Sequence, residues 1–244
     1  MKVAIIDIGT NTFNLLITSK SNGKLVFEHV EKEFVYLGKG GINNNIIRKE
    51  AFERGIKTLN SFSQKAKKSG VNKIIAIATS AVRNANNGKE FVNAAIEKTG
   101  IEINIISGNS EADFIYQGAK TGTEFGEKPI LLMDIGGGST EFIICNNKEV
   151  FWRQSFEIGV VRLFEKFHKN DPISNHELSQ IDEYLNTQLT PLFKAIKNYD
   201  IKTLIGSAGA FTSLAKMITH RNNSTELLKK TSEYLFNINQ YHEI

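Results

Sequence analysis

Two segments of the chain repeat one pattern, and this repeat constrains the fold more than any other feature. DIGTNTFNLLI (7–17) and DIGGGSTEFII (134–144) align without a gap, and each follows a short apolar run. Apolar runs of this length indicate buried strands, so each copy predicts a strand, a turn rich in glycine and hydroxyl groups, and a second strand. The shared order of elements favours an internal duplication over chance.

After each copy, a third strand is expected and the apolar spacing then becomes helical. The expected third strands are 25–30 and 150–156; the expected helices are 48–70, 88–99, 111–120, 160–168, 176–199 (broken near Pro191) and 211–218; the further strands are 73–79, 103–107 and 202–208. Strands that alternate with helices favour an α/β class, with mixed sheets flanked by helices. We therefore expect two lobes, 1–125 and 126–244, with the active site in the cleft between them.

The composition is that of an ordinary globular chain, with 41% hydrophobic and 23% charged residues. Only three prolines and the lack of a low-complexity tract argue against long disordered linkers. No run approaches the ~20 apolar residues of a membrane span, so no membrane contact is expected. A lone cysteine, Cys145, forms no internal disulfide, which favours a cytoplasmic location. The net charge of +4 suits an anionic ligand, and the lack of a basic stripe interleaved with aromatic residues argues against nucleic acid.

The two turns carry groups that bind anions. Glycines at 136, 137 and 138 leave backbone N–H groups uncovered, and such turns wrap anions with amide dipoles. Hydroxyl and amide donors are added by Ser139 in the second turn and by Thr10, Asn11 and Thr12 in the first. Three carboxylates, Asp7, Asp134 and Glu141, suit a divalent cation beside the bound phosphate. The alternative is a pair of tight hairpins whose polar side chains only satisfy turn amides.

Other common motifs are missing. The chain has no GxxxxGK[ST] and no G-x-G-x-x-G, so neither a P-loop nor a dinucleotide fingerprint is supported. IGSAG (205–209) is half of a nucleophile elbow, but Ile205 takes the place of the first glycine. The histidines show no metal-ligand spacing and favour surface or core positions; they are His29, His168, His176, His220 and His242.

Four motifs together resemble the exopolyphosphatase / guanosine pentaphosphate phosphohydrolase family. They are DIGTNTFNLLI, ATSAVRNANNG (78–88), ISGNSEADFIYQG (106–118) and DIGGGSTEFII. The first and last indicate only the actin-like (ribonuclease H-like) superfamily of sugar kinases and heat-shock ATPases, and the middle two narrow it to the phosphatases. The resemblance implies a two-lobed, duplicated actin-like fold, a polyphosphate or guanosine pentaphosphate substrate, and Mg²⁺ or Mn²⁺ as cofactor. Since the family often forms dimers, a homodimer is one expected assembly.

The resemblance also implies residue roles. Glu111 matches the glutamate that activates the attacking water, and Arg83 matches the arginine that holds substrate phosphate. Asp7 and Thr10–Thr12 match the first phosphate-and-metal loop, and Asp134, Gly136–Gly138, Ser139 and Glu141 match the second. Gly206, Ser207 and Gly209 match a later loop of the second lobe, where a nucleotide would bind. Without the family, Glu111 is an ordinary helix N-terminal glutamate and Arg83 an ordinary surface arginine.

Two departures from the family keep other functions open. Ser110 stands where the family often has the first of two glutamates, and family chains continue beyond residue 244 with a segment that returns to the first lobe. The second lobe is therefore expected to be truncated. The first alternative is a nucleotide-dependent kinase or actin-like ATPase that shares the two turns. The second is a protein that binds polyphosphate or an alarmone without turnover.

Overall fold

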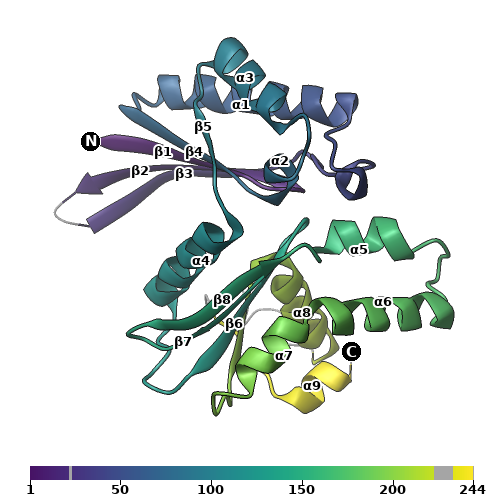
Figure 1. The fold of residues 1–244 in the computed structure, drawn as a ribbon. Helices are drawn as coiled ribbons and strands as arrows, with labels where there is room; N and C mark the ends of the chain where they lie inside the picture. Colours follow the sequence, from purple (N-terminus) through teal and green to yellow (C-terminus); the bar gives the residue numbers. More distant parts are fainter. Residues whose placement is uncertain (22–23, 223–232, 244) are drawn as a thin grey trace. The chain divides into compact units, whose positions relative to one another are not determined.

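The computed structural model describes residues 1–21, 24–222 and 233–243 (Figure 1). The chain forms two compact units. The first contains Met1–Gly108, Gly137–Ser139 and Glu157–Leu185, and the second contains Asn109–Gly136, Thr140–Phe156 and the described part of Asn186–Ile244. Every strand of the first sheet lies within 1–125 and every strand of the second within 126–244. The single lobe boundary at residue 125 stays a prediction, because the compact units exchange segments on both sides of it.

The first sheet has five strands in the order β3-β2-β1-β4-β5. They are β1 (Lys2–Ile8), β2 (Thr12–Ser21), β3 (Lys24–Phe34), β4 (Lys73–Ala78) and β5 (Ile103–Ile105). The first three strands pair in antiparallel fashion, whereas β4 and β5 are parallel to β1 and to β4 respectively. Alternate residues of β1 and β2 are buried, as a strand with one covered face requires.

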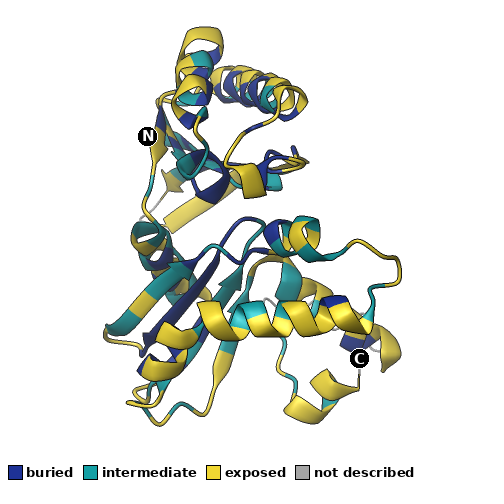
Figure 2. Cartoon of the chain, turned by 45° about the vertical axis from the view of Figure 1, so that its right-hand side comes forward, coloured by how far each residue is buried: buried dark blue, intermediate teal, exposed yellow. Residues whose placement is uncertain are grey.

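Helices cover one face of this sheet. The helical elements of the first unit are η1 (Ile42–Asn44), α1 (Lys49–Lys68), α2 (Ser80–Arg83), α3 (Gly88–Thr99), α5 (Val160–Phe167) and α6 (Asn175–Gln188), whose last turn extends past the unit. Figure 1 shows α1 and α3 on the same side of the sheet. Their apolar side chains, including Phe62 and Phe91, pack on Ile6, Ile8 and Phe13. The buried residues of α1 recur at helical spacing and so lie on one side of the helix. The opposite side of α1 is exposed (Figure 2).

The second sheet repeats this arrangement with four strands in the order β8-β7-β6-β9. They are β6 (Ile130–Ile135), β7 (Thr140–Cys145), β8 (Val150–Phe156) and β9 (Leu204–Ser207). The helices of this part of the chain are α4 (Gly108–Gly122), α7 (Thr190–Ile196), α8 (Ala208–Arg221) and α9 (Ile238–His242). Ala112 and Tyr116 of α4 pack on Leu132 and Ile143, so α4 covers the face to which those two strand residues point.

The two sheets support the duplication that the sequence predicts. In each, a three-stranded antiparallel meander is followed by a strand parallel to the first. The registers also correspond, because Asp7 pairs with Asn14 across β1 and β2, and Asp134 pairs with Glu141 across β6 and β7. Both aspartates lie at the same end of the first strand of their meander, directly before a glycine-containing loop.

Candidate active site

The first loop, Gly9–Asn11, joins β1 to β2 and is shaped by its carbonyl groups. A Cβ on Gly9 would lie 2.9 Å from the carbonyl oxygen of Thr12, so a larger residue would distort the turn. The carbonyl oxygens of Thr10 and Asn11 accept hydrogen bonds of 2.8–3.0 Å from backbone N–H groups in residues 35–38. In the part of the chain that the structure describes, no acceptor pairs with the N–H groups of Thr10 and Asn11.

The second loop, Gly136–Ser139, joins β6 to β7 and repeats this feature. The carbonyl oxygen of Gly137 accepts from the N–H of Val161 at 2.9 Å, and that of Gly138 accepts from Gly159 N at 3.3 Å and from Arg162 Nε at 3.2 Å. Within the described residues, the N–H groups of positions 137–139 have no protein acceptor. Both loops therefore use their carbonyl groups to hold their shape and leave N–H groups for another acceptor. This is the property of an anion-binding loop.

These two loops are in contact within the first unit. A Cβ built on Gly138 would lie 2.5 Å from Thr10 Oγ1 and 2.6 Å from Ser80 Oγ, so two hydroxyl groups rest against the Gly138 backbone. A Cβ on Gly137 would lie 3.0 Å from the Thr10 side chain. Gly137, Gly138 and Ser139 are thus part of the same compact unit as Thr10, Asn11 and Thr12. Glycine at 138 is required because the backbone approaches both hydroxyls closely.

Arg83 lies beside these loops in a charged network. It ends α2, and its guanidinium donates to the carbonyl oxygen of Ile106 at 3.3 Å and to Glu157 Oε1 at 3.4 Å. The other oxygen of Glu157 accepts from Ser80 Oγ and from Arg162 Nη2, both at 2.8 Å. Arg162 is only 8% exposed and also donates to the carbonyl oxygen of Ile42 at 3.0 Å. One carboxylate therefore joins two guanidinium groups beside the second loop.

The predicted carboxylates divide between the two units. Asp7 lies at the end of β1 in the first unit, where Asn14 Nδ2 donates to its Oδ2 at 3.0 Å. Asp134 and Glu141 are neighbours on paired strands of the second unit. Ser155 Oγ donates to Glu141 Oε1 at 2.6 Å, and the hydroxyl of Ser207 donates to Asp134. Burial raises the pKa of Asp134, although the bond from Ser207 opposes this shift.

Glu111 shares a face of the second sheet with these two carboxylates. It lies in the first turn of α4, next to the fully buried Ala112, which packs on Leu132 and Ile143. Because strand side chains alternate between faces, Asp134 and Glu141 point to the same face as Leu132 and Ile143. The second unit thus brings Glu111, Asp134 and Glu141 to one side of its sheet. Their grouping with Arg83, Asp7 and the loops of the first unit stays a prediction.

The predicted metal site of Asp7, Asp134 and Glu141 stays a prediction. Among the described residues, no group of three or more His, Cys, Asp or Glu side chains is placed to hold a metal ion. Mg²⁺ is usually bound through one or two carboxylates together with water and substrate phosphates. The adjacent carboxylates of Asp134 and Glu141 match that requirement.

The loop after β9 differs from a nucleotide-binding loop. A Cβ on Gly206 would lie 2.0–2.2 Å from ring atoms of Phe211, so the phenyl ring of Phe211 covers this glycine. Ser207 is engaged with Asp134, and Ala208 has a positive φ of 67°. Nothing lies within 4 Å of a Cβ built on Gly209. The predicted role of Gly206, Ser207 and Gly209 in holding a nucleotide stays a prediction.

Sequence reasoning did not single out Glu157, Arg162 or Ser80. EIGVVR (157–162) matches no short motif, and an arginine in the first turn of an amphipathic helix is ordinarily exposed. The carbonyl groups that accept hydrogen bonds from Arg162 belong to Gly138 and Ile42, which are 24 and 120 positions away along the chain. The only available signal was the glycine Gly159, whose Cβ would lie 2.4 Å from the backbone of Gly137 and which therefore marks a close approach of two segments.

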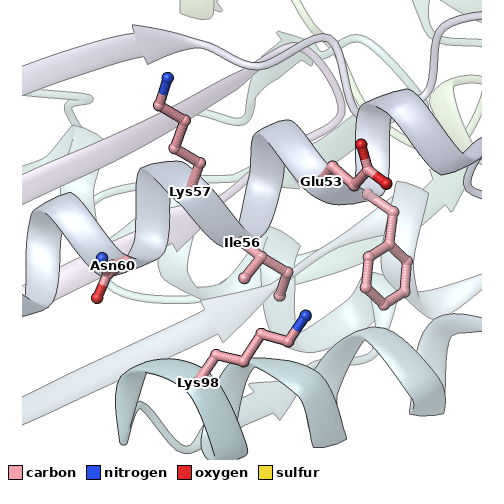
Figure 3. Close-up of a pocket in the computed structure, with 6 residues that line it drawn as sticks. Glu53, Ile56, Lys57, Asn60 and Lys98 are labelled. Carbon is pink, nitrogen blue, oxygen red and sulfur yellow. The ribbon is translucent and has the colours of Figure 1, made fainter.

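A separate hollow lies away from these loops, between α1 and α3 (Figure 3). Its volume is about 290 Å³, and it is lined by Phe52, Glu53, Ile56, Lys57, Asn60 and Lys98. None of these residues belongs to the predicted site. Among the described helices, none has the length and apolar character needed to cross a membrane.

Comparison with known proteins places the chain among phosphatases. The sequence model described as the Ppx/GppA phosphatase family matches residues 16–244. A bifunctional 3-dehydroquinate synthase/phosphatase from Fusobacterium nucleatum is 36% identical over 223 residues, which is 86% of this chain and 33% of the relative. The chain thus spans about a third of that relative's length. A putative exopolyphosphatase from Haemophilus influenzae is 29% identical over a segment that covers 89% of this chain and 67% of the length of that relative.

A solved structure agrees over the whole chain. The crystal structure of an exopolyphosphatase from Cytophaga hutchinsonii superposes with a TM-score of 0.95 at 37% identity, covering 100% of this chain and 78% of that one. This likeness confirms the expected fold class, a duplicated α/β fold of the actin-like type with mixed sheets flanked by helices.

Proposed function

The chain belongs to the Ppx/GppA phosphatase family, and on that premise we propose that it is a phosphohydrolase that releases the terminal phosphate of inorganic polyphosphate, guanosine pentaphosphate or both. The observation that carries this proposal is the pair of touching loops in the first unit. Their carbonyl groups are engaged, and the N–H groups of Thr10, Asn11 and residues 137–139 have no acceptor in the described chain. N–H groups and hydroxyls of this kind supply the donors that a phosphoanhydride needs.

Each residue has a defined part in this reaction. The loops bind the terminal phosphate, and Arg83 neutralises the negative charge on the equatorial oxygens of that phosphate. Glu111 accepts the proton of the attacking water as the P–O bond to the leaving phosphate breaks. Asp134 and Glu141, with Asp7, would hold Mg²⁺ or Mn²⁺, which when bound supplies positive charge to the phosphate oxygens. The names of the Haemophilus and Cytophaga proteins support polyphosphate as the substrate.

One alternative is weaker on a specific ground, and the other keeps one observation in its favour. A kinase or ATPase needs a nucleoside site near Gly206, and the ring of Phe211 against that glycine argues against one there. Non-catalytic binding of polyphosphate or an alarmone is favoured by Ser110, which removes one of the two family carboxylates. We include in the proposal a cytoplasmic location, which rests on the lone buried Cys145, and a homodimer, which rests on the family resemblance.

A phosphate-release assay tests the proposal. Polyphosphate and guanosine pentaphosphate are each incubated with the chain, with and without Mg²⁺, and with the Glu111→Gln variant. We expect Mg²⁺-dependent release, reduced about 100-fold or more in the variant, which is the usual contribution of a general base. Glu102→Gln changes the same charge at an exposed position and should retain activity. Tight binding without release by the unmodified chain would favour the non-catalytic alternative, and full activity of Glu111→Gln would remove the assigned base.

A further inference from the structure

The direction in which a loop N–H group points is fixed by the carbonyl group of its own peptide unit. A trans peptide is planar, and its C=O and N–H bonds point in opposite directions. The carbonyl group of Gly138 shares a peptide with the N–H of Ser139. The carbonyl group of Thr10 shares one with the N–H of Asn11. Neither N–H has an acceptor among the described residues, so whatever holds the two carbonyl groups aims two donors of the proposed site.

Arg162 of α5 holds the carbonyl group of Gly138. Its Nε donates to that oxygen at 3.2 Å, beside a bond from the N–H of Gly159 at 3.3 Å. Of these two donors the guanidinium is the stronger, because hydrogen bonds from a charged group are roughly twice as strong as neutral ones. The guanidinium is itself fixed, since its Nη2 donates to Glu157 Oε2 at 2.8 Å and the side chain is only 10% exposed.

The same guanidinium is connected to the first loop. Its Nη1 donates to the carbonyl oxygen of Ile42 at 3.0 Å. The N–H of Ile42 donates to the carbonyl oxygen of Gly38 at 3.0 Å, and the N–H of Gly38 donates to that of Thr10 at 3.0 Å. A Cβ on Gly38 would lie 2.5 Å from Thr10 Cγ2, so this segment rests directly against the first loop. One series of hydrogen bonds therefore runs from the first loop through Arg162 to the second.

We propose that Arg162 is a positioning residue that aims the Ser139 N–H at the substrate phosphate and ties its direction to that of the first loop. This inference rests on the proposed function, because it takes the acceptor to be the terminal phosphate of the substrate. Arg162 acts through the loop and not by touching the phosphate. Donors that are held in place beforehand need no rearrangement as charge develops on the reacting phosphate, which is why such donors accelerate a reaction.

Arg162→Lys tests this role while it keeps the positive charge. An ammonium group lacks the planar fork and cannot serve Glu157 and both carbonyl groups together. We expect turnover, and the affinity for inorganic phosphate and tripolyphosphate by calorimetry, to fall roughly tenfold to hundredfold, the effect of losing one hydrogen bond from a charged group. Both are measured well below the melting temperature of the variant.

Arg48→Lys is the matched control. Arg48 Nε also donates to a glycine carbonyl of the same segment, that of Gly40 at 2.8 Å. Gly40 lies outside the series of hydrogen bonds that joins the two loops, and among the described residues Arg48 makes no hydrogen bond to either loop. This variant should change neither turnover nor phosphate affinity.

The amide signals of the second loop give a readout that a purely structural role would not move. A hydrogen bond from an N–H to a phosphate oxygen is short, and a short bond moves the amide proton resonance downfield. Inorganic phosphate should therefore shift the Ser139 amide proton in the unmodified chain, and this shift should shrink in Arg162→Lys. The Gly138 amide is the internal control, because the carbonyl group of its peptide, that of Gly137, is held by the N–H of Val161 at 2.9 Å. Its shift should persist in the variant.

The inference is overturned if Arg162→Lys and Arg48→Lys bind phosphate equally well, or if the Ser139 shift is as large in Arg162→Lys as in the unmodified chain. It is also overturned if phosphate leaves the Ser139 amide of the unmodified chain unchanged, and this measurement needs no variant to fold. Failure of the proposed function has a separate sign, which is a response of the Ser139 amide to phosphate without phosphate release from either substrate.

Discussion

Replacing Gly138 with alanine tests directly whether the contact between the two loops creates the site. The added Cβ would lie 2.5 Å from Thr10 Oγ1 and 2.6 Å from Ser80 Oγ, whereas ordinary contacts begin at 3.4 Å. The two hydroxyl groups must turn aside or the two loops must move apart, and the Ser80 Cβ, also only 2.9 Å away, must give as well. Overpacking of this kind costs about 1–3 kcal/mol of folding free energy. A displacement of about 1 Å between groups that position a substrate can lower turnover about 100-fold.

The assay combines phosphate release, calorimetry with inorganic phosphate and thermal melting. We expect Gly138→Ala to lose turnover and phosphate affinity while it still melts cooperatively. Gly118→Ala is the matched control, because nothing lies within 4 Å of a Cβ at this helical position. It should stabilise the chain by about 0.5–1 kcal/mol, as alanine does when it replaces glycine inside a helix. Unchanged phosphate affinity in Gly138→Ala would refute the claim that the touching loops bind the anion.

Two carboxylates with shifted pKa values give further predictions. Burial raises the pKa of Asp134, so the Asp134 carboxyl binds a proton more tightly in the folded chain than in the unfolded chain. Stability therefore falls as the pH rises from the ordinary pKa of an aspartate to the raised one. With a chelator present and at a pH above the raised pKa, Asp134→Asn should melt at a higher temperature than the unmodified chain, and an equal melting temperature would contradict this. Hydrogen bonds, first from the Ser174 backbone N–H and hydroxyl and then from Lys169 and Asn170, lower the pKa of Glu177. Glu177→Gln should therefore lower the melting temperature at neutral pH, and the difference should vanish as acid protonates Glu177 in the unmodified chain; a difference that persists in acid would count against this cause.

Much of the fold is predictable from sequence because it follows from local periodicity. The helix expected at 88–99 is observed as Gly88–Thr99, and the break expected near Pro191 separates α6 from α7. Helix spacing and proline chemistry act over a few residues, so they are visible in the sequence. The expected helix at 111–120 begins earlier, at Gly108, because the first turn includes polar residues that give no apolar signal.

The site was only partly predictable, because some of its residues are brought together by the tertiary fold and not by local sequence. The glycine and hydroxyl groups of both loops are evident in their motifs, as are the carboxylates at the strand ends. Arg162 gives no such signal, because its role depends on carbonyl groups at Gly138 and Ile42 that only the tertiary fold brings to it. The roles assigned to Glu111, Arg83 and the metal ligands stay predictions that the assays above decide.

The interleaving of the two compact units has a consequence for engineering. The chain passes from one unit to the other five times, after residues 108, 136, 139, 156 and 185. A fragment cut at residue 125 would lack Gly138, Gly159 and Arg162, so its β-hairpins would remain without the second loop that touches Thr10. Splitting the gene into halves, or exchanging one half for that of a relative, should therefore succeed only when both pieces are supplied together and reassemble.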